Sequence, residues 1–172
     1  MAQSARKPTR LGVYDYSETG VYFVTICSKD KQNLFGSIVG GGALDAPRSA
    51  LSPIGQIVDK YIRSTNKIPE ITVEKYVIMP NHIHLLLSVE HENGTSRAPS
   101  PTSSSRANQL LPHAISTLKR FVNRDVGYNV FQRSFHDHIV RGEQDYREIW
   151  QYIDENPQKW QEDCFFVESI PH

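Results

Sequence analysis

Two histidines stand one residue apart at the head of an apolar run, in the stretch MPNHIHLLL (79–87). Side chains in a strand alternate between its two faces, so His82 and His84 share one face while Ile83 and Leu85 share the other. The two imidazoles then lie roughly 6–7 Å apart along the strand, close enough for two ring nitrogens to converge on one ion. From these residues alone, the pair is either a metal site or two half-exposed histidines on a sheet surface.

A tyrosine and an asparagine near the C-terminus form the second candidate group, in WQYIDENPQKW (150–160). Tyr152 and Asn156 are four residues apart, which makes them neighbours on one face of a helix. That face is offset from the apolar stripe of the same helix. The stripe comprises Tyr146, Ile149, Trp150 and Ile153. If the helix docks over the histidine face, a phenol and an amide oxygen reach the histidines. Otherwise the two residues simply lie at the border between the apolar and polar faces of an amphipathic helix.

Together these groups would suit metal-assisted chemistry on phosphate. Two imidazoles and one neutral oxygen leave a divalent ion with open positions, as catalysis requires. Without a thiolate, the set suits Mn²⁺ or Mg²⁺ better than structural zinc. A phenol, with a pKa near 10, is a poor nucleophile at neutral pH unless it is activated. Its attack on a phosphodiester would give a covalent phosphotyrosine, which conserves the bond energy for rejoining.

Length and composition predict one domain over residues 1–172. No apolar run approaches the ~20 residues of a membrane span, and the basic N-terminus lacks the apolar core of a signal peptide. Cys27 and Cys164 show no metal-like spacing, which suits a reducing cytoplasm and predicts that both are buried small hydrophobes. We therefore expect a cytoplasmic protein with no membrane partner.

The net charge of zero gives no global indication of a nucleic-acid partner. Basic residues are nevertheless concentrated between positions 106 and 141, and such a run is either a phosphate-binding surface or a solvated helix face. Its candidate DNA contacts are Lys119, Arg120, Arg133 and Arg141.

Periodicity predicts an α+β fold with a mainly antiparallel sheet and helices on one face. The expected strands are 21–28, 71–79 and 82–89, with short β pieces around Phe131 and Ile139. The expected helices are 53–66, 110–123 and 143–155. Pro80-Asn81 alone separates the second and third strands, which indicates a hairpin. Segments at about 40–50 and 91–108 read as flexible loops inserted into the one domain.

Three stretches together resemble the single-tyrosine HUH transposases, including the REP-associated tyrosine transposases. YVIMPNHIHLLL (76–87) resembles the family's His-hydrophobe-His motif. GVYFVTICSKDKQNLFG (20–36) is similar to its first strand and following loop, and FQRSFHDHIVRGEQDYREIWQYIDENPQKW (131–160) to its C-terminal block. The resemblance spans roughly residues 12–160, apart from the two loops.

The resemblance implies a ferredoxin-like (RRM-like) fold, usually in a homodimer, that cuts single-stranded DNA near hairpins through a 5′-phosphotyrosine. It implies a divalent metal, Mg²⁺ or Mn²⁺, and no small-molecule cofactor. Carried over to this chain, it makes His82 and His84 metal ligands and Tyr152 the nucleophile. Asn156 takes the position of the third ligand, which is glutamine in some relatives. Because asparagine is shorter, it requires the helix to lie closer to the histidines.

Other residues and functions compete with this interpretation. His136 and His138 form a second His-x-His pair, for which a structural or DNA-contacting role is expected, and Tyr146 is a second possible nucleophile. The alternative functions are a domesticated protein that binds DNA hairpins without cutting them, an RRM-like RNA binder, and a metallohydrolase that uses water. A non-cutting descendant would not need His82, His84, Tyr152 and Asn156 together, and a metallohydrolase would not need Tyr152. An RRM-like binder would present aromatic residues on its sheet face, where histidines are expected here.

Overall fold

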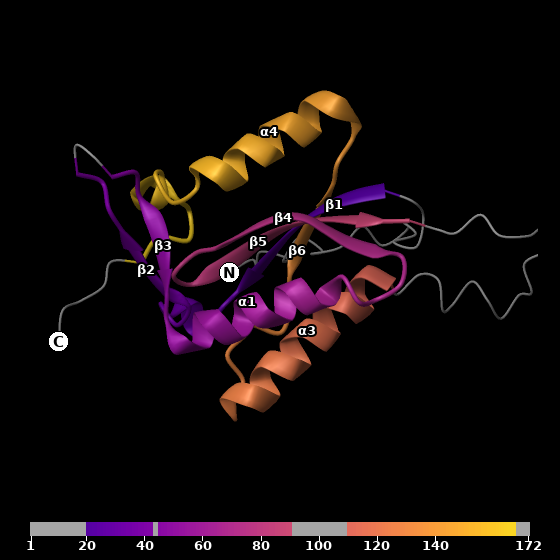
Figure 1. The fold of residues 1–172 in the computed structure, drawn as a ribbon, viewed down its shortest axis with the longest axis horizontal. Coiled ribbons are helices and arrows are strands. Elements are labelled where there is room, and N and C mark those ends of the chain that lie inside the picture. The colour runs from indigo at the N-terminus through magenta and orange to yellow at the C-terminus, as the bar shows by residue number, and fades with distance from the viewer. Residues whose placement is uncertain (1–19, 43–44, 91–109, 168–172) are drawn as a thin grey trace, which may run out of the picture.

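The computed structural model describes residues 20–42, 45–90 and 110–167, which are organised around a four-stranded antiparallel sheet (Figure 1). The spatial order is β4–β5–β1–β6. Its strands are β1 (Gly20–Cys27), β4 (Ile71–Ile78), β5 (His82–Val89) and β6 (His136–Ile139). With helices α1 (Pro53–Thr65) and α3 (Leu110–Val126), the chain order is β-α-β-β-α-β. This is the ferredoxin-like arrangement, so the predicted fold class is confirmed.

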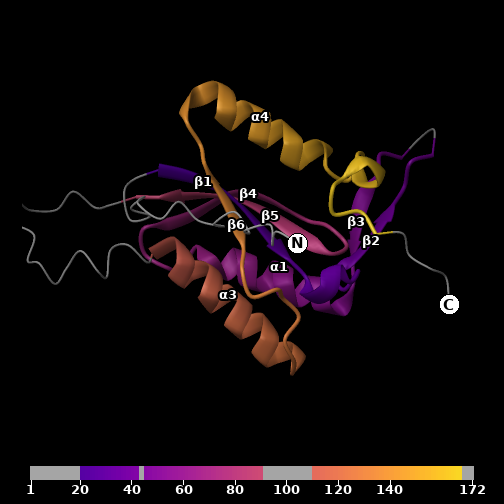
Figure 2. The same cartoon turned by 180° about the vertical axis from the view of Figure 1, so that it is seen from behind.

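Helices lie on both faces of this sheet (Figures 1 and 2). Helices α1 and α3 cover one face, whereas α4 (Gly142–Glu155) lies across the other. In this, α4 departs from the predicted arrangement with helices on one face. The reason is its narrow apolar side: Ile149 and Ile153 pack against Leu86, which points away from the main core. Strand β5 is therefore buried on both faces.

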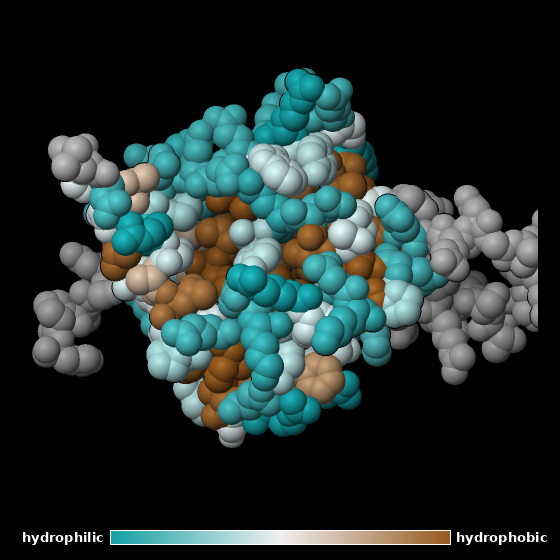
Figure 3. All heavy atoms as spheres, in the orientation of Figure 1, coloured by the Kyte–Doolittle hydropathy of each residue, from teal (hydrophilic) through white to brown (hydrophobic). Residues whose placement is uncertain are grey.

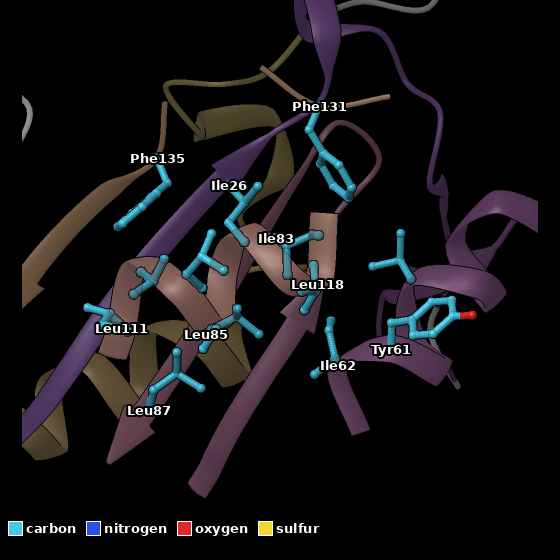
Figure 4. Packing of buried hydrophobic residues seen from close by; sticks show 14 of the residues in the cluster. Ile26, Tyr61, Ile62, Ile83, Leu85, Leu87, Leu111, Leu118, Phe131 and Phe135 are labelled. Carbon is cyan, nitrogen blue, oxygen red and sulfur yellow. The ribbon is translucent and has the colours of Figure 1, made fainter. Parts of the chain in front are cut away.

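The main hydrophobic core lies between the sheet and the pair α1 and α3 (Figure 4). Apolar residues of β1 and β5 alternate toward it, as the period of two requires. The cluster includes Ile26, Ile83, Leu85, Leu87, Ile62, Leu111 and Leu118. Residues between these positions point to the α4 face, and this alternation fixes which face receives the histidines.

Local signals set the ends of the elements that carry the site. Ser52 caps α1, because its Oγ accepts a hydrogen bond from the Gly55 amide at 3.0 Å, and Pro53 follows at the first helical position. Just after the end of β4, the Met79 amide donates a hydrogen bond to the His82 carbonyl oxygen at 2.8 Å. This closes the predicted Pro80-Asn81 hairpin turn and makes His82 the first residue of β5.

The predicted loop at about 40–50 is wrong in part. Strands β2 (Gly36–Val39) and β3 (Arg48–Leu51) form a separate antiparallel hairpin, so β3 covers the end of that segment. Gly40 has a φ of 91°, and a Cβ there would lie 2.8 Å from the Ala46 carbonyl oxygen, so the bend needs glycine. The other predicted loop, at 91–108, lies outside the described residues.

Two residues predicted to be buried are exposed instead. Trp150 is 36% exposed, and Lys75 of β4 sits over its ring at 4.0 Å from the centroid. Cys164 is exposed, whereas Cys27 is buried as expected. Figure 3 shows α4 with a mainly hydrophilic outer surface above hydrophobic residues of the sheet layer.

Two short 3-10 helices complete the described structure, η1 (Lys29–Lys31) and η2 (Trp160–Glu162). None of the helices in the described ranges is long and apolar enough to cross a bilayer.

Candidate metal centre with a tyrosine

The two histidines of β5 converge on one point under α4. The side chains of His82 and His84 share the α4 face and are 0% and 2% exposed. Their Nε2 atoms are 3.0 Å apart. The expectation that the two imidazoles lie on one face is confirmed, and they are buried, not half-exposed.

Each imidazole is held from behind through its Nδ1 atom. The Nδ1 of His82 is 2.9 Å from Asn81 Oδ1, and the Nδ1 of His84 is 2.9 Å from Thr25 Oγ1. Thr25 is the cross-strand partner of His84 on β1, so sheet register places it there. Partners of this kind fix the orientation of a ligating imidazole.

Burial keeps both rings neutral near neutral pH. It lowers the pKa of His82 to about 4, although the negative charge of Asp163 opposes the shift. It also lowers the pKa of His84 well below its ordinary value, and the neighbouring His82 adds to that shift. Neutral imidazole is the form that binds a metal ion.

Tyr152 reaches the same point from α4. Its hydroxyl oxygen lies 3.4 Å from His84 Nε2, and the ring lies edge-on to His84 and to Phe23. The residue is 39% exposed, so its phenol stands between the buried imidazoles and solvent. Burial raises the pKa of Tyr152 to about 12, with a further contribution from the charge of Asp163.

Asn156 lies one helical turn after Tyr152 and is 2% exposed. Its Nδ2 donates to Asp163 Oδ2 at 3.2 Å. Its Oδ1 is buried and has no hydrogen-bond partner among the described residues. A buried amide oxygen without a partner is costly, and a bound cation is one explanation for it. Asn156 thus contacts Asp163, the carboxylate beside His82, and its role as the third metal ligand stays a prediction.

Asp163 belongs to this group and was missed by the sequence analysis. Its side chain is 3% exposed, and its Oδ2 lies 3.8 Å from His82 Nε2. Its Oδ1 accepts a hydrogen bond from the Phe165 amide at 2.7 Å, which holds the carboxylate in place. It follows η2 in a segment without helical or strand periodicity, so no sequence pattern marked it.

These donors fit a divalent cation. Ligand atoms of His82, His84 and Asp163 all lie within 4.8 Å of one another. The Asn156 Oδ1, which has no partner within the described part of the chain, is a further candidate ligand. Two nitrogens and two oxygens suit borderline to hard divalent ions such as Mn²⁺. The carboxylate makes this set more anionic than the neutral set expected from sequence.

The other predicted residues lie elsewhere or are engaged otherwise. Lys119 donates to the carbonyl oxygens of Gln132 and Ser134 at 2.9 and 3.1 Å, so it holds the segment before β6. Arg120 packs over Phe121 on the same helix, α3, and this helix covers the face of the sheet opposite to α4 (Figure 1). Lys119 and Arg120 are thus remote from the pair His82 and His84.

Arg133 and Arg141 are exposed near β6. His136 and His138 are exposed on β6, where His138 Nε2 lies 2.8 Å from Asp145 Oδ2 and so ties the strand to α4. Tyr146, the competing nucleophile, packs against Trp150 instead of the histidines.

Comparisons with known proteins identify relatives of the chain and of its fold. No protein-family model matches the sequence. An uncharacterized protein of Haemophilus influenzae is 31% identical over an alignment of 179 positions, which covers 95% of this chain and 94% of that protein. A REP-associated tyrosine transposase, solved bound to a REP hairpin, superimposes with a TM-score of 0.54 at 19% identity and covers 92% of this chain and 74% of its own.

A putative transposase from Deinococcus radiodurans covers 90% of this chain and 97% of its own at 16% identity, but its TM-score of 0.32 is too low to support an argument. The identity and coverage of the Haemophilus protein establish common descent. The REP-associated enzyme establishes a shared fold, as the resemblance of the three sequence stretches predicted. The chain therefore belongs to the family of this Haemophilus influenzae protein and has the fold of a REP-associated tyrosine transposase.

Proposed function

We propose that this protein is a metal-dependent transposase that nicks and rejoins single-stranded DNA at hairpin or repeat ends, with Tyr152 as the nucleophile. One observation carries the proposal: the partly exposed Tyr152 hydroxyl lies 3.4 Å from His84 Nε2, which faces His82 Nε2 at 3.0 Å. A phenol is thereby held beside a ready-made pair of metal ligands. The fold neighbour bound to a REP hairpin supports hairpin DNA as the substrate class.

The ligands in this proposal are His82, His84 and Asn156, joined by Asp163. They would hold Mg²⁺ or Mn²⁺. Such an ion, when bound, lowers the pKa of a nearby hydroxyl and offsets negative charge on a phosphate. The raised pKa of Tyr152, about 12, indicates that the chain alone keeps the phenol protonated, which is why the proposal needs a cation.

In the proposed reaction Tyr152 is the nucleophile, and the polarity of cleavage is the one that the resemblance to the tyrosine transposases implies. Its oxygen attacks the phosphorus, a tyrosine O–P bond forms, and the bond from phosphorus to the 3′ oxygen breaks. The phenol loses a proton and the departing 3′ oxygen gains one, which leaves a 3′-hydroxyl and a 5′-phosphotyrosine. Attack by another 3′-hydroxyl reverses these steps and joins a new strand.

DNA contacts and assembly complete the proposal. Exposed Arg133 and Arg141 are better phosphate contacts than Lys119, whose ammonium already binds backbone carbonyl oxygens. Tyr152 and His84 of one chain are in contact, and we propose that a single chain supplies both groups to the site. The expected homodimer remains a prediction.

The proposal is tested with single-stranded DNA carrying the hairpins that flank the gene, in Mn²⁺ or in EDTA, on denaturing gels. The wild type and Tyr146→Phe should form a metal-dependent protein–DNA adduct, and Tyr152→Phe should form none. Tyr146→Phe is the matched control because it removes a hydroxyl from the same helix away from the histidines. Cleavage that survives Tyr152→Phe would indicate a water-using hydrolase. Binding without cleavage would indicate the domesticated hairpin-binding protein.

A further inference from the structure

Asn81, the turn residue before the histidine pair, has its side-chain amide bonded at both ends. It is 1% exposed. Its Nδ2 donates to the carbonyl oxygen of Phe165 at 2.7 Å and to that of Lys31 at 3.2 Å. Carbonyl oxygens only accept hydrogen bonds, so the amide nitrogen must be at that end. The amide oxygen therefore faces His82.

This orientation fixes the tautomer of His82. Because Asn81 Oδ1 can only accept, the Nδ1 of His82 must carry the proton in their 2.9 Å hydrogen bond. The Nε2 of a neutral His82 is then a bare lone pair directed at His84. His82 is thus held in the form that a metal ion requires, with or without an ion.

His84 has a partner of a different kind. In the metal-free protein, its Nε2 must donate to the bare Nε2 of His82, because two lone pairs 3.0 Å apart would repel each other. The Nδ1 of His84 is then an acceptor, and the Thr25 hydroxyl donates to it at 2.9 Å. For both Nε2 atoms to act as ligands, the proton of His84 must move from Nε2 to Nδ1, and the Nδ1–H then donates a hydrogen bond to Thr25 Oγ1. A hydroxyl can fill both roles, whereas an amide oxygen cannot.

We propose that Asn81 and Thr25 are unequal positioning residues of the metal centre: Asn81 locks His82 in the ligating tautomer, and Thr25 lets His84 change tautomer when a cation binds. The inference rests on the proposed function only in assuming that a divalent cation binds the histidine pair. The inference gives the Asn81 side chain a role in the metal centre as well as in the turn.

Mn²⁺ affinity, measured by calorimetry without DNA, tests the role of Thr25. Thr25→Val keeps the shape but removes the hydroxyl, so it should weaken Mn²⁺ binding by about 10- to 100-fold. Thr25→Ser should restore nearly wild-type affinity. Thr65→Val is the matched control, because the Thr65 hydroxyl is also buried but donates only to the Tyr61 carbonyl oxygen in α1. Wild-type affinity in Thr25→Val would overturn the role of Thr25.

Nitrogen NMR of the ¹⁵N-histidine-labelled wild type tests the tautomers without any substitution. In EDTA, His82 should be protonated on Nδ1 and His84 on Nε2; at saturating Mg²⁺, both should be protonated on Nδ1. An Nε2-protonated His82 in EDTA, or an unchanged His84 in Mg²⁺, would refute the inference. If the metal results are as expected but no DNA adduct forms, the proposed function fails while this inference stands.

Discussion

Acidification of the metal-free protein should destabilise it through the buried histidines. The pKa of His82 is about 4 in the folded chain, against an ordinary value of 6.5. The folded-state value is the lower one, so the unfolded chain binds more protons between these pH values. The free energy of unfolding therefore falls as pH drops from about 6.5 toward 4. His84, whose pKa is also lowered by burial, acts in the same direction.

The size of the effect follows from the shift. Between pH 7.5 and pH 5, His82 alone should cost about 2 kcal/mol of unfolding free energy, since each pH unit inside the window is worth about 1.4 kcal/mol. Urea unfolding in EDTA at several pH values measures this loss. His82→Gln should reduce the loss by about 2 kcal/mol. The exposed His136 supplies the control, because His136→Gln should leave the loss as in the wild type.

Equal pH dependence in the wild type and in His82→Gln would refute the reasoning. It would mean that His82 is as easily protonated in the folded as in the unfolded chain. The buried, neutral pair facing each other at 3.0 Å would then not describe the protein in solution.

Two further predictions concern what holds Tyr152 and the cation in place. Ile153→Ala should lower the unfolding free energy by about 2–4 kcal/mol in urea titrations and reduce adduct formation more than tenfold, because Ile153 and Ile149 anchor α4 on Leu86. Trp150 is exposed on the same helix, so Trp150→Ala should have a smaller effect on both quantities. Asp163→Asn keeps the side-chain size but removes the charge, so calorimetry should show Mn²⁺ binding weakened at least tenfold; unchanged affinity would exclude Asp163 as a ligand.

The sequence predicted those parts of the site that depend on local rules. Alternation along β5 put His82 and His84 on one face, and the Pro80-Asn81 turn set the start of that strand. Helical spacing put Tyr152 and Asn156 on one side of α4. These patterns depend on residues that are close in the sequence, so they can be recognised without knowledge of the tertiary contacts.

The parts that were not predicted depend on contacts between distant segments. Asp163 reaches His82 because Asn81 binds the Phe165 carbonyl oxygen and the Phe165 ring packs on His82 at 4.7 Å between centroids. Trp150 fits the apolar spacing of α4 but is exposed, because Ile149 and Ile153 make the contact with Leu86 and Trp150 meets the charged Lys75 instead. Such outcomes are set by tertiary packing, which periodicity in one segment does not record.

The polar cluster under α4 is better explained by ligand binding than by folding. A sheet face could be covered with apolar residues alone, as the opposite face of β5 is. Here two imidazoles, a carboxylate and an amide oxygen are withdrawn from water under α4. The carboxylate accepts two hydrogen bonds, but the Asn156 oxygen has no partner among the described residues, and burying an unpaired polar group or a charge costs folding free energy. A divalent cation would offset the charge of the carboxylate and pair with the free oxygen, and Tyr152 is the member of the group that remains open to a substrate.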